Sequence, residues 1–251
     1  IILSPNPSYP IHPYGFIIAG ASLRHLPAMD DGIFKPDLYL ERLESSIIES
    51  VPTPVAVIVS FPSNPTAQVV SLEFYEEVVK IALKYNVYIL SDLAYAEIYY
   101  DNFPPPSILQ IPKAKEIAVE FTSMSKTYAM AGWRIGFAVG NKTLINALTR
   151  IKSYLDYGAF TPVQVSAAAA LNGPQDCVQE IRNIYQKRRD VLINSMARAG
   201  WNIPSPKASM FAWAPIPDKY KKRGSLEFAK ELMLNADVAV YTGVAFGEFG
   251  E

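Results

Sequence analysis

Residues 123–137 set a single lysine beside two serines and an arginine, in the sequence Ser123-Met124-Ser125-Lys126-Thr127-Tyr128-Ala129-Met130-Ala131-Gly132-Trp133-Arg134-Ile135-Gly136-Phe137. The amine of a lysine can form a Schiff base with an aldehyde, whereas a serine hydroxyl and an arginine guanidinium bind phosphate groups well. Lys126, Ser123 and Arg134 are therefore suited to hold the two ends of a phosphorylated aldehyde. A lysine and an arginine are more often solvated or paired at the surface, so the other segments must decide between these interpretations.

Three apolar runs of strand length are each followed by polar side chains. The runs cover residues 55–61, 87–90 and 117–121. The first precedes Asn64, the second precedes Asp92 and Tyr95, and the third precedes Ser123. Ligand sites in open α/β sheets lie beyond the carboxyl ends of the strands, so these side chains are predicted to share one site.

Each of these side chains also has an ordinary structural interpretation. Asn64 before a proline could form a turn, Asp92 could cap a helix or a turn, and Tyr95 could be a core residue with its hydroxyl near the surface. The proline-rich segment 5–10 could be a turn that half-buries Tyr9. Taken together, however, separate segments would have to imitate one site, which favours the functional interpretation.

The segment 123–137 resembles the pyridoxal phosphate attachment signature of the class I and II aminotransferases and agrees with it at every fixed position. In that family Asn-Pro, Asp-x-x-Tyr, Ser-x-Ser-Lys and Arg follow one another along the chain. Here the same order is formed by Asn64, Asp92, Tyr95, Ser123, Ser125, Lys126 and Arg134. The segment 5–10 resembles the part of the family whose aromatic residue stacks on the cofactor ring, a place that Tyr9 would take. The resemblance therefore implies pyridoxal 5'-phosphate as the cofactor.

The resemblance also implies a role for each residue. Lys126 would hold the cofactor covalently and, once released, would move the proton of the substrate α-carbon. Asp92 would keep the pyridine nitrogen of the cofactor protonated, because a buried carboxylate favours a positive charge beside it. Asn64 and Tyr95 would hydrogen-bond the 3-oxygen of the ring. The phosphate would bind Ser123 and Arg134, with Ser125 also among the cofactor-binding residues.

The implied reaction is the transfer of an amino group between an amino acid and a 2-oxo acid. Residues 7–15, 61–67 and 150–158 look like the alanine-type branch, which exchanges glutamate and alanine with pyruvate and 2-oxoglutarate and lies near the diaminopimelate aminotransferases. In aspartate-specific relatives an arginine after the helix that matches residues 142–155 binds the second substrate carboxylate. Residues 154–162 contain no arginine, although Arg150 or Lys152 could reach the site. A diaminopimelate- or aspartate-type aminotransferase, a pyridoxal phosphate β-lyase and a non-catalytic sensor domain remain alternatives.

The composition is typical of a cytoplasmic enzyme. The chain has 251 residues, half of them hydrophobic, and a net charge of -1, which gives no basic stripe for a nucleic acid. Cys177 is the single cysteine, so disulfides within the chain and multi-cysteine zinc sites are excluded, and the two histidines make a poor case for any metal site. No apolar run approaches the length of a membrane span.

The alternation of apolar runs and amphipathic segments predicts an α/β fold, and the resemblance specifies fold type I of the pyridoxal phosphate transferases. We expect a large domain at residues 1–173, with a mostly parallel sheet covered by helices on both faces, and a smaller α/β domain at 174–251. Helices are predicted at 72–85, 142–155, 163–171, 174–199 and 226–235, and C-terminal strands at 209–215 and 238–244. Relative to the family, the large domain lacks its N-terminal part and the small domain is truncated. The resemblance also implies a homodimer.

Overall fold

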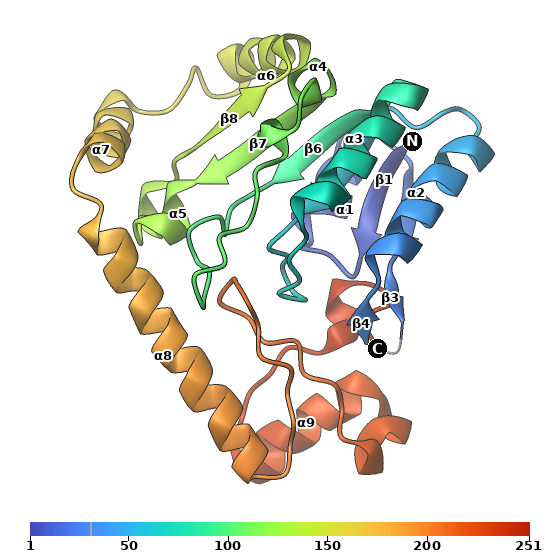
Figure 1. The fold of residues 1–251 in the computed structure, drawn as a ribbon, viewed down its shortest axis with the longest axis vertical. Coiled ribbons are helices and arrows are strands. Elements are labelled where there is room, and N and C mark those ends of the chain that lie inside the picture. The colour runs from blue at the N-terminus through green and yellow to red at the C-terminus, as the bar shows by residue number, and fades with distance from the viewer. Residues whose placement is uncertain (31) are drawn as a thin grey trace.

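The computed structural model describes residues 1–30 and 32–251 and has an α/β architecture (Figure 1). Its strands are β1 Ile2–Asn6, β2 Leu23–Pro27, β3 Met29–Asp30, β4 Ile33–Phe34, β5 Ala56–Ser60, β6 Tyr88–Asp92, β7 Ala118–Ser123 and β8 Gly136–Gly140. Its α-helices are α1 Ile11–Ile18, α2 Pro36–Glu49, α3 Leu72–Tyr85, α4 Ala114–Ile117, α5 Met124–Thr127, α6 Lys142–Leu155, α7 Thr161–Asn172, α8 Asp176–Arg198 and α9 Gly224–Ala236. Short 3₁₀ helices cover η1 Ile108–Gln110, η2 Ala131–Trp133, η3 Asp218–Arg223 and η4 Gly243–Phe246.

Six strands form one mainly parallel sheet in the order β2-β1-β5-β6-β7-β8. The pairs from β2 to β7 are parallel, and β8 runs antiparallel to β7. The chain places β2 on one side of β1 and then adds β5 and β6 on the other side, so the strand order reverses between β1 and β5. Ligands of open α/β sheets bind beyond the carboxyl ends of the strands at such a reversal. This confirms the predicted sheet and locates the edge where a site is expected.

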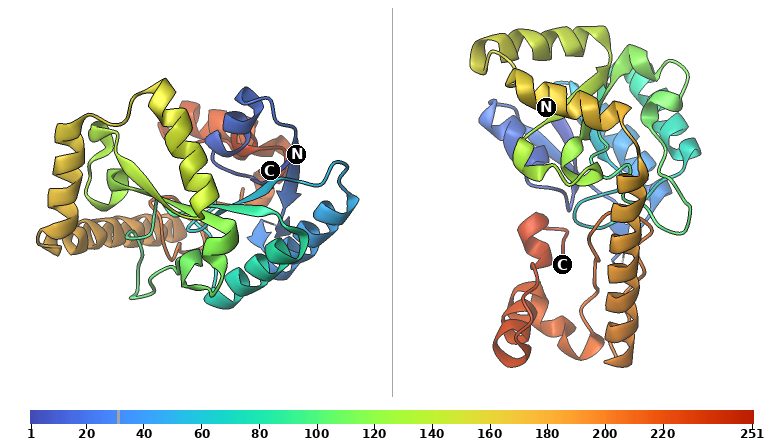
Figure 2. Two further views of the ribbon diagram at one scale, coloured as in Figure 1. Left: turned by 90° about the horizontal axis from the view of Figure 1, so that it is seen from above. Right: turned by 90° about the vertical axis from the view of Figure 1, so that its left-hand side faces the viewer.

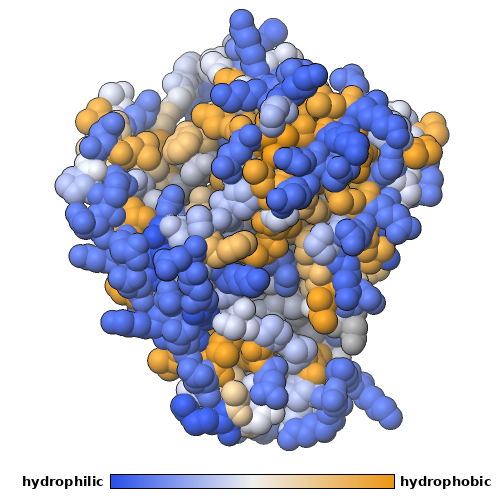
Figure 3. All heavy atoms as spheres, viewed as in Figure 1, coloured by the Kyte–Doolittle hydropathy of each residue, from blue (hydrophilic) through white to orange (hydrophobic). Residues whose placement is uncertain are grey.

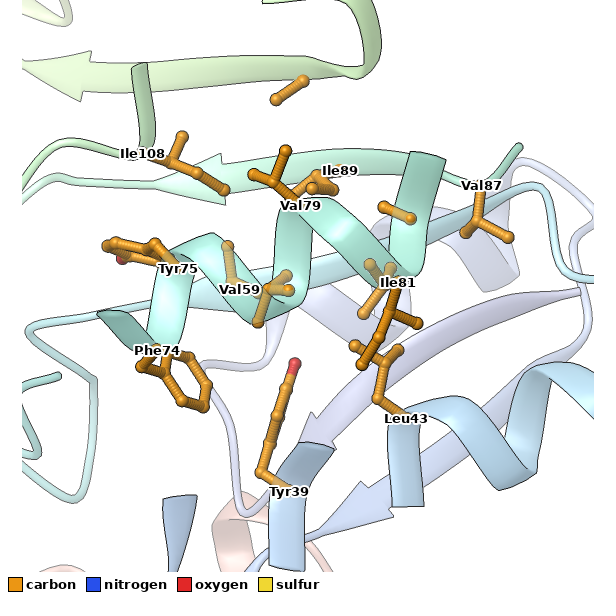
Figure 4. Close-up of a cluster of buried hydrophobic side chains, with 14 of the residues drawn as sticks. Tyr39, Leu43, Val59, Phe74, Tyr75, Val79, Ile81, Val87, Ile89 and Ile108 are labelled. Atoms are coloured by element: carbon orange, nitrogen blue, oxygen red, sulfur yellow. The ribbon is translucent and has the colours of Figure 1, made fainter. Parts of the chain in front are cut away.

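Helices cover both faces of the sheet. Figures 1 and 2 show α2 and α3 on one face, with α1 and α6 on the other. The core under α2 and α3 is close-packed (Figure 4), and its buried side chains include Tyr39, Leu43, Val59, Phe74, Tyr75, Val79 and Ile89. Burying one large apolar side chain contributes about 1.5–3 kcal/mol, so this layer holds β5 and β6 firmly in place.

Local signals determine the helix bounds. At the start of α3 the Ser71 hydroxyl accepts a hydrogen bond from the amide N–H of Phe74, and beyond its end Asn86 takes the left-handed conformation that ends many helices. The predicted bounds 72–85 and 142–155 agree with α3 and α6 to the residue. The other three predicted helices are present as α7, α8 and α9, with ends that differ by one or two residues. No helix within the described residues combines the length and apolar character that a membrane crossing requires.

The two strands predicted near the C-terminus are wrong. Residues 209–215 have no regular secondary structure, and residues 238–244 are irregular until η4 begins at Gly243. A strand requires a hydrogen-bonded neighbour along its length. In the described part of the chain, the nearest approach to such pairing is one isolated antiparallel bridge between Tyr99 and Ala208. The C-terminal part is therefore built mainly on α8 and α9, which lie beyond the sheet (Figure 2).

Candidate active site

Three neighbouring strands deliver the predicted residues to one edge of the sheet. Ser60 at the end of β5 pairs with Asp92 at the end of β6, and Asp92 pairs with Phe121 in β7. Because these strands are parallel, the segments that follow them emerge from the same edge. Asn64 lies four residues beyond Ser60, and Lys126 lies five residues beyond Phe121. The sheet thus orders the predicted residues as the sequence analysis expected.

Asp92 is held by two hydrogen bonds that fix its carboxylate. Oδ1 accepts a bond from the amide N–H of Ala94 at 3.1 Å, and Oδ2 lies 2.9 Å from Nε2 of His12. The side chain is still 29% exposed, which leaves carboxylate surface for a ligand. A carboxylate held in this way can keep a protonated ring nitrogen in a defined position.

The contact of His12 with Asp92 is not predicted from the sequence, in which the two histidines make only a poor case for a metal site. His12 is buried in α1, and its Nδ1 has no hydrogen-bond partner among the described residues. The Tyr9 ring packs on it edge to face, with 5.8 Å between the ring centroids. The spacing of three residues indicates that Tyr9 and His12 lie close together at the start of α1, but no local signal indicates the contact of His12 with Asp92. The described residues contain no cluster of three or more His, Cys, Asp or Glu side chains that could hold a metal ion.

Tyr95 lies in the same group of side chains. Burial of its phenol and, secondarily, the negative charge of Asp92 raise the pKa of Tyr95 to about 12, while its interaction with the Asn64 side chain lowers it. The hydroxyl therefore stays protonated and can donate a hydrogen bond to an anionic oxygen. Tyr9 also lies close enough for its phenol to raise the pKa of Tyr95 slightly. Four predicted residues, Tyr9, Asn64, Asp92 and Tyr95, are thus brought together.

The short helix α5 presents Lys126. The Ser123 hydroxyl accepts a hydrogen bond from the amide N–H of Ser125 at 3.1 Å, which caps the helix. Met124 and Thr127 are buried and anchor one side of α5, while Ser125 and Lys126 are partly exposed on the other side. Among the described residues the Lys126 amine has neither a hydrogen bond nor an ion pair, which leaves it available to an incoming group.

Arg134 approaches α5 from the antiparallel strand. Ser123 pairs with Gly136, and the amide N–H of Met124 donates to the carbonyl of Ile135, so the chain before β8 returns alongside the start of α5. Gly136 is required there, because a β-carbon would lie 2.6 Å from the carbonyl oxygen of Thr122. Arg134 has a left-handed backbone with φ of 50°. Its guanidinium donates only to the Ala131 carbonyl within the described chain and has no carboxylate partner there.

The donor set fits a phosphorylated pyridine aldehyde. Asp92 suits a protonated ring nitrogen, Tyr95 suits a phenolate-type oxygen, and the unpaired amine of Lys126 suits an aldehyde. Arg134 and the two serine hydroxyls supply cationic and neutral donors for a phosphate. Contacts link Tyr9, Asn64, Asp92 and Tyr95 to one another. The positions of Lys126 and Arg134 relative to this group follow from the pairing of β6 with β7 and of β7 with β8.

A cavity of about 630 Å³ elsewhere contains none of the eight predicted residues and lies between residues 66–69 and the C-terminal loops at 200–207 and 213–218. Ser123 instead lines a cavity of about 430 Å³ beside α7 and α8, together with Tyr128 and Gln175. We therefore place the candidate site by its chemical groups, at the carboxyl ends of β5, β6 and β7.

Comparison with known proteins identifies the family of the chain. The family model for aminotransferase class I and II matches residues 1–250. The glutamate-pyruvate aminotransferase AlaC of Escherichia coli strain K12 is 55% identical over 250 residues, which cover 100% of this chain and 60% of that protein. The LL-diaminopimelate aminotransferase of Moorella thermoacetica is 40% identical over 256 residues, which cover 100% of this chain and 62% of that protein.

Solved structures with the same fold are also found. Apo BacF from Bacillus subtilis superimposes with a TM-score of 0.89 at 31% identity, covering 99% of this chain and 64% of that chain. A double mutant of Thermus thermophilus aspartate aminotransferase gives a TM-score of 0.84 at 25% identity, covering 98% and 62%. The chain spans about three fifths of the length of the curated relatives compared above. By its sequence and its fold, it belongs to the class I and II aminotransferase family.

Proposed function

We propose that this chain carries the pyridoxal 5'-phosphate site of an aminotransferase. The observation that carries the proposal is the fixed carboxylate of Asp92 at the end of β6, beside a segment in which Lys126 and Arg134 have no acidic partner within the described residues. When bound, the cofactor supplies an electron sink that makes the α-proton of an amino acid removable. Each residue then has a task that matches its surroundings.

Asp92 holds the proton on the ring nitrogen, with its own position set by His12 and the Ala94 amide. Tyr95 and Asn64 hydrogen-bond the ring 3-oxygen, and Tyr9 stacks on the ring. Lys126 would hold the cofactor covalently, and its free amine would serve as the base that moves the α-proton of the substrate. Ser123, Ser125 and Arg134 bind the phosphate, for which the guanidinium offers a planar pair of donors.

The proposed substrates are glutamate and alanine as amino donors, with pyruvate and 2-oxoglutarate as acceptors. The high identity to a protein named glutamate-pyruvate aminotransferase supports this pair. The absence of arginine from residues 154–162 supports only the alanine and pyruvate half of the pair, because these substrates have one carboxylate and an arginine would be the natural bidentate partner of a second one. LL-diaminopimelate is the second candidate, supported by relatives of that name at 40% identity.

We also propose a homodimer and a division of the chain at Gly173. Large exposed apolar side chains lie at the end of α6 and in the segment before α7, namely Tyr154, Leu155, Tyr157 and Phe160. An exposed patch of this kind supports a two-fold interface between copies of the chain. Gly173 lies between α7 and α8, at the point where the chain leaves the sheet for the C-terminal part. The single cysteine supports a reducing cytoplasm as the location.

The test is the visible absorbance of the full-length protein with pyridoxal 5'-phosphate. An amino donor should bleach the band of the bound cofactor, and pyruvate or 2-oxoglutarate should restore it. Lys126→Ala should lack the band, with Lys80→Ala as a control, since Lys80 pairs with Glu77 on the surface of α3. A band that no amino acid changes would contradict the aminotransferase proposal, and release of pyruvate and ammonia without an acceptor would identify a β-lyase instead.

A further inference from the structure

Two arginines on α8 are largely buried, although most of that helix carries hydrophilic side chains on its outer surface (Figure 3). The side chains of Arg182 and Arg189 are 13% and 9% exposed. They are seven residues apart, which is about two helical turns, so both project from the same side of α8. Charged side chains are rarely buried unless specific partners hold them.

Arg182 binds Glu97, which lies two residues beyond Tyr95. Its Nε donates to the carbonyl of Glu97 at 3.1 Å, and its Nη2 donates to Oε2 of the same residue at 2.8 Å. The guanidinium also lies 3.8 Å from the centre of the Tyr99 ring, within the range of a cation–π contact. Backbone, carboxylate and ring contacts together fix both the distance and the orientation of this segment.

Arg189 repeats the arrangement two turns later. Its two terminal nitrogens donate to the two carboxylate oxygens of Asp101 at 2.6 and 3.1 Å, and Nη1 also donates to the Pro206 carbonyl at 3.2 Å. The guanidinium lies 4.7 Å from the centre of the Tyr100 ring. Arg189 lowers the pKa of the Asp101 carboxyl, and a bidentate pair of this kind adds geometric specificity.

The same stretch of chain is joined to the C-terminal part by its backbone. The amide N–H of Tyr100 donates to the Lys207 carbonyl at 2.9 Å, and the amide N–H of Ser209 donates to the Ile98 carbonyl at 2.7 Å. Two residues after Ser209, the Phe211 ring packs edge to face on Tyr95, with 5.5 Å between the centroids. Residues 97–101 therefore connect α8, the 206–211 segment and the candidate site.

We propose that Arg182 and Arg189 are positioning residues that clamp residues 97–101 to α8. The clamp thereby fixes the position of Tyr95 and of the Phe211 ring that packs on it. The proposal rests on the proposed function, because it assigns Tyr95 to the cofactor. Apolar side chains could bury the same area, but they would not fix the position of this segment as two guanidinium groups with directed hydrogen bonds do. Loss of a clamp is expected to loosen Tyr95 without removing any group that touches the cofactor.

The first measurement needs no cofactor. Hydrogen–deuterium exchange of the full-length apo protein should show amides 95–101 exchanging about tenfold faster in Arg182→Met and Arg189→Met than in the wild type. Arg188→Met is the matched control, because Arg188 is exposed on the same helix. Glu97→Gln weakens one clamp from the other side and keeps α8 intact, so it should shift the same amides to a smaller degree. Unchanged exchange in folded Arg182→Met and Glu97→Gln would overturn the proposal.

The second measurement links the clamp to Tyr95. Arg182→Met and Tyr95→Phe should each raise the dissociation constant of pyridoxal 5'-phosphate about tenfold, and the double variant should raise it by little more than either single variant. A purely structural role predicts independent effects, which would multiply to about a hundredfold and would contradict the proposal. A wild type without a cofactor band would instead overturn the proposed function, and exchange at residues 95–101 would still decide whether the clamp exists.

Discussion

Nε2 of His12 lies 2.9 Å from Oδ2 of Asp92, although 80 residues separate them in the sequence. The contact joins α1 to the carboxyl end of β6, and it provides one of the two hydrogen bonds that orient the carboxylate. In the proposed function Asp92 carries the charge that faces the cofactor ring. His12 therefore helps to set the orientation of the Asp92 carboxylate relative to the cofactor ring.

His12→Phe should weaken cofactor binding about tenfold, because a hydrogen bond to a charged group contributes roughly 1.5–3 kcal/mol and part of that is recovered by water. The dissociation constant of pyridoxal 5'-phosphate, measured by absorbance titration, checks this. His25→Phe is the control, since His25 is exposed on β2. Equal effects from both substitutions would show that the His12 contact has no special role.

Asp92→Asn keeps the shape of the side chain and removes its charge. Without the carboxylate the ring nitrogen should lose its proton, and turnover should fall at least about a hundredfold, or about 2.7 kcal/mol in the activation barrier. Steady-state kinetics with an amino donor and a 2-oxo acid give the measurement. Asp37→Asn, at an exposed position in the first turn of α2, should leave turnover unchanged. Near-normal turnover in Asp92→Asn would remove Asp92 from the proposed site.

Arg134→Gly should make the protein more stable and at the same time weaken its binding of the cofactor. A non-glycine residue in the left-handed region costs roughly 1–2 kcal/mol, so glycine should raise the free energy of unfolding by about 1 kcal/mol. The loss of the guanidinium should raise the dissociation constant of the cofactor at least about tenfold, or about 1.4 kcal/mol. Asp237→Gly is matched, because Asp237 has φ of 53° and is exposed at the end of α9. It should stabilise the protein and leave binding unchanged, and the same result in Arg134→Gly would argue against a phosphate role.

Tyr95 makes the protein sensitive to alkaline pH. The native state holds the phenolic proton up to a pKa of about 12, whereas the unfolded chain releases it near the ordinary value of 10.0. The stabilising contribution of the neutral phenol is therefore complete below the unfolded pKa and is lost as pH rises from 10.0 toward about 12. The free energy of unfolding, measured with denaturant, should differ between the wild type and Tyr95→Phe by a constant amount below pH 10.0. As the pH rises toward about 12, the wild type should lose stability relative to Tyr95→Phe. A constant difference throughout would contradict the burial of the phenol.

Local signals account for what the sequence predicted well. Ser71 and Asn86 bracket α3, and its apolar spacing is that of a helix, so the bounds 72–85 could be read directly. The apolar runs at 55–61 and 117–121 likewise indicated strands, which are present as β5 and β7. The order of the polar segments placed Asn64, Asp92 and Lys126 at the same edge of the sheet.

Contacts between distant residues account for what the sequence did not predict. His12 could not be assigned to Asp92, because nothing near either residue indicates the other. Residues 209–215 have a strand-like composition, but the structure gives Ser209 a single backbone bond to Ile98 and no continuing ladder. The clamp of Arg182 on Glu97 likewise depends on how α8 packs against residues 97–101, which no local pattern encodes.

The central claim is that Lys126 binds the cofactor covalently. The direct measurement is borohydride reduction of the full-length protein after incubation with pyridoxal 5'-phosphate, followed by peptide mass spectrometry. We predict one modified peptide, with the modification on Lys126, and none in samples reduced without the cofactor. Stoichiometric modification of another lysine, or an unmodified Lys126 in protein that has bound the cofactor, would contradict the account.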